Sequence, residues 1–371
     1  MLNDAINFHQ IQRVLVTKLR HHGDVLLTSP VFSVLKKHFP HLKLDALVYH
    51  ETREMLTLHP AIDHVFTIDR AWKKRGLIKQ VKNELALLKK LQAQNYDLLI
   101  HLTEHWRGLY LKRLLRLPFA VTQIYARRSG RYWRKTFTHH YPAPLNSRHT
   151  VEKNLDALRR LGLYPQIEDC GLVLIPGAAA EKRIETLMQE HGLISKEFVQ
   201  LHPASRWFYK TWDGQKTSAL IDRLEGSGKR VVVTAAPAEQ ELELVKGILS
   251  NTKSAPVNLS GLLNLKELAA LIAQAQCLVG VDSVPMHIAA AMSTPVVALF
   301  GPSNELLWAP WQVRHQVISS KQRPCRPCAQ HGCGGGERSD CLNDIVVDEV
   351  FAAVERLCSV SRFEKSYFLK K

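Results

Sequence analysis

Residues 277–302 read CLVGVDSVPMHIAAAMSTPVVALFGP and contain the clearest supersecondary pattern in the chain. Two short, continuous apolar runs, Cys277–Val281 and Pro295–Phe300, are typical of parallel strands that are covered on both faces. Between them, Asp282 and Ser283 are expected to cap a helix whose first N–H groups point outward at the carboxyl end of a strand. This geometry suits a diphosphate, so the segment indicates a nucleotide-linked substrate.

The alternation of strand and helix extends through both halves of the chain. Apolar runs predict further strands at 11–19, 42–49, 65–68, 96–102, 120–126, 198–202, 230–235 and 257–259. Amphipathic patterns predict helices between several of them, at 76–94, 149–161, 182–190, 214–224, 238–249 and 265–274. A loop is expected over 20–29, followed by a helix with Pro30 as its first residue and Thr28 or Ser29 as its cap. Such repeated alternation predicts the α/β class, with two Rossmann-like parallel-sheet domains.

The domain boundaries are placed where this alternation is interrupted. Residues 1–165 are predicted to form the first domain and residues 181–345 the second, with the proline- and glycine-containing segment 166–180 as the linker. Residues 346–371 are expected to form one or two helices that could cross back to the first domain. The sequence contains neither a GxGxxG fingerprint nor a P-loop.

The net charge restricts the class of partner. The 371 residues include 50 lysines and arginines against 34 acids, which gives a formal charge of +16. Such a field favours nucleic acid, an acidic membrane surface or a phosphorylated substrate, without choosing among them. The first residues lack the order of a signal peptide, and no apolar stretch is long enough to span a bilayer. With seven cysteines, an odd number, reduced thiols in the cytosol are the simpler expectation.

Asp24 is the acidic candidate of the first domain. It follows the first predicted strand in the segment HHGDVLL, where Gly23 would permit a tight turn. Ligands of such sheets gather at the carboxyl ends of strands, so Asp24 could act as a general base toward a sugar hydroxyl. Alternatively, its carboxylate hydrogen-bonds its own turn, and the local sequence alone favours this second interpretation.

Three polar residues of the second domain are candidates for nucleotide contacts. Lys210 and Ser205 lie in an aromatic-rich loop after the strand predicted at 198–202, where they could neutralise a phosphate and donate to it. Glu239 follows the strand predicted at 230–235, where an acid could hold ribose hydroxyls. The alternatives are a solvated loop lysine and a favourable charge in the first turn of a helix.

Basic residues concentrate in two clusters of the first half, at 70–90 and 126–135. Charge runs of this kind are usually solvated faces. The second cluster includes Arg127, Arg128 and Arg131 together with aromatic residues, and it is the better candidate for contacting phosphate groups or an anionic membrane surface. No nucleic-acid-binding motif accompanies the charge.

Four cysteines lie close together near the end of the chain: Cys325, Cys328, Cys333 and Cys341. Their spacing matches no common zinc-finger pattern, so free structural thiols are favoured over a zinc or iron–sulfur site. The sequence also has no Asp-x-Asp pair of the kind that holds a divalent ion against a nucleotide diphosphate.

Together these segments resemble one enzyme family over nearly the whole chain. The resemblance is carried by residues 18–40 (KLRHHGDVLLTSPVFSVLKKHFP), 201–212 (LHPASRWFYKTW), 279–303 (VGVDSVPMHIAAAMSTPVVALFGPS) and the pattern PCRPC…C…CLNDI at 324–345. The chain is thereby similar to the ADP-heptose heptosyltransferases of lipopolysaccharide core assembly, glycosyltransferase family 9. The basic segment 120–144 and the following 148–163 are most similar to the heptosyltransferase III branch.

The resemblance implies a GT-B architecture, in which two Rossmann-like domains face a central cleft. It further implies a transfer that inverts the configuration at the anomeric carbon and requires no metal or other cofactor. It also implies a role for each matching residue: Asp24 as the catalytic base, Lys210 and Ser205 at the donor diphosphate, Asp282, Ser283 and the Val284 backbone at sugar and diphosphate, Glu239 at the ribose, and Leu263 near the adenine. The sequence departs from the family at Val284, where many relatives have glycine, and in the Lys210 loop, which is one residue longer than in the first heptosyltransferase.

The expected function is an inverting transfer of L-glycero-D-manno-heptose from ADP-heptose to a heptose of the phosphorylated inner core. The expected location is cytoplasmic, peripheral on the inner membrane, where the basic first domain would meet a phosphorylated glycolipid and an anionic membrane surface, with no nucleic acid. Three alternatives remain at this point: a heptosyltransferase I or II acting earlier on the core, a nucleotide-sugar epimerase, and a non-catalytic envelope-binding protein.

Overall fold

The computed structural model describes residues 4–74, 76–125, 130–142 and 148–368. The chain divides into two compact units, Met1–Leu174 and Ile175–Lys371, here called the N-terminal and C-terminal units. The division between Leu174 and Ile175 falls inside the segment 166–180, and the domain bounds drawn from the sequence stay predictions.

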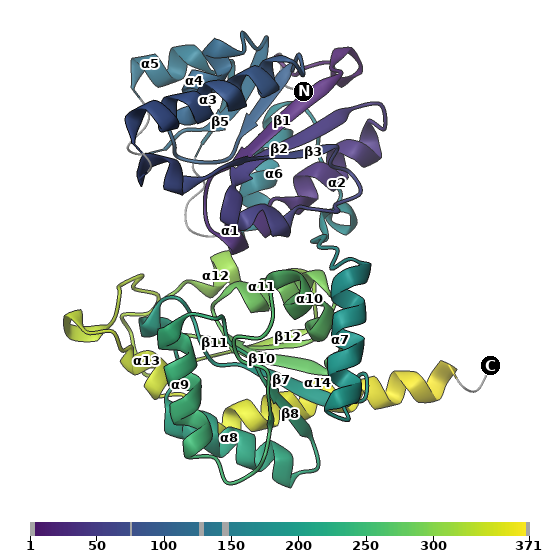
Figure 1. The fold of residues 1–371 in the computed structure, drawn as a ribbon, viewed down its shortest axis with the longest axis vertical. Coiled ribbons are helices and arrows are strands. Elements are labelled where there is room, and N and C mark those ends of the chain that lie inside the picture. Colours follow the sequence, from purple (N-terminus) through teal and green to yellow (C-terminus); the bar gives the residue numbers. More distant parts are fainter. Residues whose placement is uncertain (1–3, 75, 126–129, 143–147, 369–371) are drawn as a thin grey trace. The chain divides into compact units, whose positions relative to one another are not determined.

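The N-terminal unit is built on a six-stranded parallel sheet of order β3-β2-β1-β4-β5-β6 (Figure 1). Its strands are β1 (Arg13–Lys18), β2 (Lys43–Tyr49), β3 (His64–Ile68), β4 (Leu98–His101), β5 (Phe119–Gln123) and β6 (His139–Tyr141). Its α-helices are α1 (His22–Leu26), α2 (Ser29–His38), α3 (Leu77–Gln92), α4 (Arg107–Leu114), α5 (Arg131–Thr136) and α6 (Thr150–Arg160). Helices α3, α4 and α5 share one hydrophobic core with the sheet, and Figure 1 shows them together on one side of it.

The C-terminal unit repeats the same design. Its strands are β7 (Phe198–His202), β8 (Arg230–Val233), β9 (Val257–Asn258), β10 (Cys277–Val281), β11 (Val296–Phe300) and β12 (His315–Ser319). Its α-helices are α7 (Ala178–Glu190), α8 (Gly214–Gly226), α9 (Glu239–Ser250), α10 (Leu265–Gln274), α11 (Val284–Ala291), α12 (Glu305–Trp308), α13 (Asp340–Asn343) and α14 (Val347–Phe368). The strand order is β12-β11-β10-β7-β8-β9. Counted from each unit's first strand, both sheets have the order 3-2-1-4-5-6, which is that of a dinucleotide-binding Rossmann domain.

The predicted α/β class, with the two Rossmann-like sheets of the GT-B architecture, is confirmed. The strand predicted over Cys277–Val281 is β10, all of whose residues are buried, as continuous apolar runs of a covered parallel strand should be. The pattern missed β6 and β12, which lie at sheet edges. Strand β12 is only half-buried, and β6 consists of just three residues, His139–Tyr141, so neither forms a long apolar run.

The predicted loop over 20–29 is wrong, because it contains the helical turn α1. Thr28 is the N-cap of α2, yet its hydroxyl donates to the Val25 carbonyl at 2.6 Å and makes no cap bond. At the other end of the chain, α14 forms one long helix that packs against α8 and strands β10, β11 and β12. A crossing of residues 346–371 back to the first domain stays a prediction.

Candidate active site

The two sheets place polar residues where ligands of Rossmann folds bind. In such sheets the crevice lies at the carboxyl ends of the two strands from which the chain continues in opposite directions, here β1 and β4, and β7 and β10. Asp24 follows β1, Lys210 follows β7, and Asp282 follows β10 directly. Each of the three residues therefore follows the carboxyl end of a strand at the switch point of the sheet in its own unit.

Asp24 is the third residue of the short helix α1. Gly23 is buried within the same helix, so the tight turn expected there is a helical turn. The Asp24 side chain is 15% exposed, and its Oδ1 lies 3.9 Å from Nε of Arg20, which is itself mostly exposed. The carboxylate is therefore partly exposed to solvent, and the Arg20 guanidinium lies beside it.

A buried lysine that sequence analysis missed lies beneath α1. Lys18, the last residue of β1, is 7% exposed and donates from Nζ to Oδ1 of Asn154 at 3.1 Å. Asn154 in α6 in turn donates from Nδ2 to the carbonyl of Leu27, the C-cap of α1, at 2.9 Å. Burial lowers the pKa of Lys18, an effect that the nearby Asp24 carboxylate opposes. The one signal in the sequence was a lysine ending an otherwise apolar strand.

The neighbouring strand β4 ends in a buried histidine. Nδ1 of His101 lies 2.5 Å from the Thr17 hydroxyl, and its Nε2 lies 2.9 Å from the His105 carbonyl. Burial lowers the pKa of His101 to about 4, so the ring is neutral at physiological pH. Gly108 is required beside it, because a Cβ there would lie 2.3 Å from the ring. His101 therefore joins β1, β4 and α4 as a structural residue.

In the C-terminal unit, Lys210 and Asp282 form a direct ion pair. Nζ of Lys210 lies 2.6 Å from Oδ2 of Asp282, and the two side chains are 20% and 7% exposed. Lys210 belongs to a single 3₁₀ turn, Phe208–Lys210, and not to an irregular loop. The structure thus brings together two of the residues predicted for the donor site. The Asp282 carboxylate thus holds the ammonium at the switch point. A phosphate that binds here would have to share the ammonium with this carboxylate or displace the carboxylate from it.

The start of α11 offers fewer backbone donors than its sequence suggested. Ser283 is the N-cap, but its hydroxyl donates to the Val281 carbonyl at 3.3 Å and makes no cap bond. Pro285 has no N–H, and the N–H of Met286 already donates to the Ser283 carbonyl. The donors of this turn are therefore the N–H groups of Ser283 and Val284. The expected side-chain cap is wrong, and an anion here would depend more strongly on Lys210.

Ser205 is buried and accepts a hydrogen bond from the N–H of Trp207 at 3.3 Å, so its hydroxyl shapes the turn that leads to Lys210. The same turn is covered by the cysteine-rich segment. His331 stacks on Tyr209 with ring centroids 5.0 Å apart, and Ser339 donates to the Tyr209 carbonyl at 2.6 Å. Residues more than a hundred positions away thus fix the backbone that carries Lys210.

Glu239 is exposed in the first turn of α9, as either interpretation of its sequence allows. The buried acid of this region is Glu241, which sequence analysis missed. Its Oε2 accepts the N–H of Ala236 at 3.1 Å, and burial raises its pKa. Leu263 is buried after a turn in which Gly261 has a φ of 75°. The signal for Glu241 was present only as a second acid in the same helical turn.

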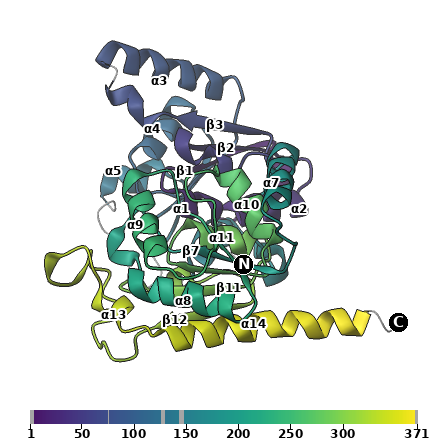
Figure 2. The ribbon, with the colours of Figure 1, turned by 60° about the horizontal axis from the view of Figure 1, so that its bottom comes forward.

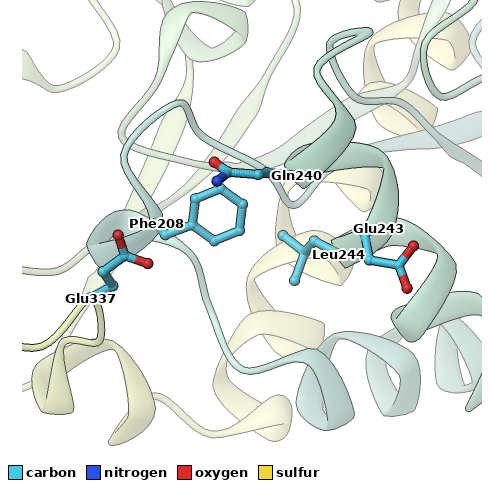
Figure 3. Close-up of a pocket in the computed structure, with 5 residues that line it drawn as sticks. All are labelled: Phe208, Gln240, Glu243, Leu244 and Glu337. Atoms are coloured by element: carbon cyan, nitrogen blue, oxygen red, sulfur yellow. The ribbon is translucent and has the colours of Figure 1, made fainter.

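A pocket of about 350 Å³ lies beside the 3₁₀ turn Phe208–Lys210, between Phe208, helix α9 and Glu337. Figure 3 shows the Phe208 ring between Glu337 and Leu244, with the Gln240 amide next to the ring. Glu243 also lines the pocket. Two carboxylates and no cation among the lining residues disfavour a diphosphate, so this hollow is a poor site for the donor phosphates.

The remaining predictions concern arginines and cysteines. Arg131 is exposed as the first residue of α5, whereas Arg127 and Arg128 lie outside the described residues. All seven cysteines are unbridged, with Cys325 and Cys333 exposed and Cys341 buried. Within the described part of the chain, no three His, Cys, Asp or Glu side chains are grouped so that they could hold a metal ion. Likewise, none of the helices described there has the length and apolar character to cross a membrane.

Comparison with known proteins agrees with this fold. The family model described as glycosyltransferase family 9 (heptosyltransferase) matches residues 84–337. Lipopolysaccharide heptosyltransferase 3 of Escherichia coli K12 is 38% identical over 343 residues, which cover 91% of this chain and 96% of that protein.

Solved structures are similar over nearly the whole chain. The glycosyltransferase family 9 protein of Veillonella parvula superposes with a TM-score of 0.81 at 22% identity, covering 96% of this chain and 99% of the other. A heptosyltransferase of E. coli solved with ADP gives 0.69 at 21% identity, with coverages of 93% and 99%. The extent of the family match and the 38% identity show that this chain is a glycosyltransferase and belongs to family 9, the heptosyltransferases.

Proposed function

We propose that this protein transfers L-glycero-D-manno-heptose from ADP-heptose to a heptose of the phosphorylated lipopolysaccharide inner core, with inversion at the anomeric carbon. The observation that carries the proposal is the Lys210–Asp282 pair at the β7–β10 switch point of a family 9 enzyme. The name of the 38% identical relative supports lipopolysaccharide as the acceptor class, and the E. coli heptosyltransferase solved with ADP supports an adenine nucleotide as the donor class.

On the donor side, Lys210 is the cation that neutralises the diphosphate. As the bond between the anomeric carbon and ADP breaks, ADP leaves with the electron pair, and the ammonium stabilises that growing negative charge. The N–H groups of Ser283 and Val284 add two donors, while Asp282 accepts from a sugar hydroxyl or holds Lys210. Glu239, exposed at the start of α9, binds the ribose, and Leu263 packs near the adenine.

On the acceptor side, Asp24 is the general base. Its carboxylate takes the proton of the acceptor hydroxyl while that oxygen forms the new bond to the anomeric carbon. The Arg20 side chain lies 3.9 Å from this carboxylate. Arg127, Arg128 and Arg131 contact the acceptor phosphates. The reaction needs no metal or other cofactor in this scheme.

We further propose that the enzyme works at the cytoplasmic face of the inner membrane as a peripheral protein. The acceptor is a glycolipid whose lipid part stays in the bilayer, and the excess of 16 positive charges matches an anionic surface. The basic N-terminal unit then serves the acceptor and the membrane, and nucleic acid is not a partner.

The proposal is tested by substituting Asp24. Asp24→Asn removes the base with little change in size, and turnover should fall by a factor on the order of 10² to 10⁴ while ADP still binds. Turnover is measured by mass spectrometry with ADP-heptose and defined truncated cores, and ADP binding by calorimetry. Asp348→Asn, at a side chain that is 82% exposed in α14, is the matched control and should keep full activity.

Two results would contradict the proposal in different ways. Full activity of Asp24→Asn would remove Asp24 as the base. Transfer by the wild-type enzyme only to a core that ends in Kdo would instead assign the protein to an earlier step of core assembly.

A further inference from the structure

Helix α3 carries a second apolar stripe that faces solvent. Its residues Leu87 and Leu91 are buried in the core of the N-terminal unit. On another side of the helix, Leu77 and Ile78 are 75% and 87% exposed, and Val81 and Leu85 are also exposed. Leu77, Val81 and Leu85 are four residues apart, and Ile78 lies three residues before Val81, so these side chains share one face of the helix. A helix that only covers a sheet would have polar residues there.

The stripe continues onto the neighbouring helix α4. The guanidinium of Arg107 in α4 makes two hydrogen bonds to the Glu84 carboxylate of α3, at 2.5 and 2.7 Å, which holds the helices together. On α4, Tyr110 and Leu114 are exposed, four residues apart. Figures 1 and 2 both show α3 next to α4. We call the six exposed residues of the two helices the α3–α4 apolar patch: Leu77, Ile78, Val81, Leu85, Tyr110 and Leu114.

Lysines border the patch. The exposed lysines of α3 are Lys79, Lys82, Lys89 and Lys90, and Lys73 and Lys74 are exposed just before the helix. At 3.6 residues per turn, the four lysines of α3 fill the sector between the apolar stripe and the buried face. The single acid of the helix, Glu84, is paired with Arg107. The surface therefore combines apolar side chains with cations that have no acid of the same helix to pair with.

We propose that the α3–α4 apolar patch docks onto an anionic lipid bilayer. A helix with an apolar stripe flanked by lysines lies in the interface between water and lipid, where the apolar side chains enter the acyl boundary and the ammonium groups meet lipid phosphates. This inference rests on the proposed function, in which the acceptor is lipid-linked and the enzyme meets an anionic membrane, and it assigns the surface that makes the contact.

Charge argues against a second copy of this chain as the occupant. Two copies docked through this face would bring the same lysines together on proteins of +16 charge, and like charges repel. An anionic bilayer supplies the opposite charge over the whole patch. In this proposal the membrane contact lies on the basic cluster 70–90. The sequence had favoured the other cluster, 126–135, for contact with an anionic membrane.

The test is flotation of the full chain with vesicles of phosphatidylethanolamine and phosphatidylglycerol. In the variant Ile78→Gln with Leu85→Gln, the partition coefficient should fall at least about tenfold, because two apolar side chains no longer leave water. The matched control is Ile194→Gln with Leu306→Gln, at two similarly exposed residues of the C-terminal unit, and it should float like the wild type.

A second pair of variants tests the charge. Lys79→Gln with Lys82→Gln should lower the partition coefficient by about fivefold for each lysine, whereas Lys246→Gln with Lys321→Gln, at exposed lysines of the C-terminal unit, should lower it less. Vesicles of phosphatidylcholine alone should bind the wild type weakly.

Three outcomes would overturn the inference: equal flotation of patch and control variants, equal binding to neutral and anionic vesicles, or a wild-type dimer that the Ile78→Gln with Leu85→Gln variant dissociates. Heptosyl transfer to a delipidated, water-soluble core separates this inference from the proposed function. The patch variant should keep that activity while it loses flotation. Absence of the transfer in the wild type would contradict the proposed function and leave the flotation result standing.

Discussion

Replacing Lys210 by methionine should weaken ADP binding and should also lower the free energy of unfolding by a similar amount. Methionine is unbranched and matches the apolar stem of lysine up to Cε, so the substitution removes the ammonium with little change in packing. That ammonium lies 2.6 Å from Oδ2 of Asp282. In the complex proposed here it turns to the diphosphate, so the same charge serves two partners in succession.

The magnitudes follow from the burial of the pair. Exposed ion pairs contribute about 0.2–1 kcal/mol, and breaking a fully buried one costs about 3–5 kcal/mol. With side chains 20% and 7% exposed, Lys210→Met should lower the free energy of unfolding by about 1–3 kcal/mol. A hydrogen bond to a charged group contributes about 1.5–3 kcal/mol, so the dissociation constant of ADP should rise about 10- to 150-fold.

Asp282→Asn should act in the opposite direction on ADP. The amide no longer holds the ammonium of Lys210 and no longer repels the diphosphate, so ADP should bind equally well or up to about tenfold more tightly. The intact donor should bind less well if Asp282 accepts from a sugar hydroxyl. Comparing ADP with ADP-heptose in one variant therefore separates the two roles of this carboxylate.

The assay is calorimetric titration of ADP into wild type, both single variants and the double variant, with urea unfolding of all four. The double-variant cycle gives the coupling of the pair with and without ADP. Wild-type ADP affinity in Lys210→Met would refute Lys210 as the diphosphate ligand. A loss in Asp282→Asn as large as that in Lys210→Met would show that Asp282 positions Lys210 for binding and does not compete with the phosphates.

Three further predictions concern other polar side chains of the two units. Asn154→Ala removes both hydrogen bonds of the Asn154 amide, so the buried amino group of Lys18 and the buried carbonyl of Leu27 lose this partner. The free energy of unfolding, measured with urea, should fall by about 3 kcal/mol, and kcat should be lower. Burial lowers the pKa of His101 and of His202 to about 4, so the unfolded chain takes up protons first as the pH falls below 6.5. The free energy of unfolding should therefore decrease between pH 6.5 and 4, by up to about 3 kcal/mol per histidine, and His101→Gln should flatten this slope; an unchanged slope would contradict the assignment. Glu239→Gln should weaken ADP binding about two- to tenfold, whereas Glu241→Gln, which can still accept the Ala236 N–H, should leave the affinity unchanged, and the reverse result would move the ribose contact to Glu241.

Much of the fold could be predicted because its signals are local. Parallel strands covered on both faces require continuous apolar runs, and the chain contains these runs wherever a strand is central in its sheet. The prediction failed at β6, which is only three residues long, at the half-buried strand β12, and where a single helical turn, α1, lies between two regular elements. A five-residue helix has too few residues to show a periodic pattern.

The candidate site could be predicted residue by residue but not as an arrangement. Asp24, Lys210 and Asp282 were identifiable because each follows a strand that the sequence itself reveals. Lys18 and Glu241 were missed, because a lone charge in a strand or a second acid in a helix gives no sign that it is buried. Ser283 was expected to cap α11, and its hydroxyl bonds to the Val281 carbonyl in its place.

The two Rossmann-like sheets, and the strand ends at which ligands could bind, were predictable because both depend on the order of apolar and polar residues along the chain. Which charged side chains lie next to each other was visible only in the folded chain. Lys210 and Asp282 are 72 residues apart, and Lys18 and Asn154 are 136 apart. Contacts over such separations depend on how strands pair and how helices pack, and no local pattern encodes the distance between two side chains.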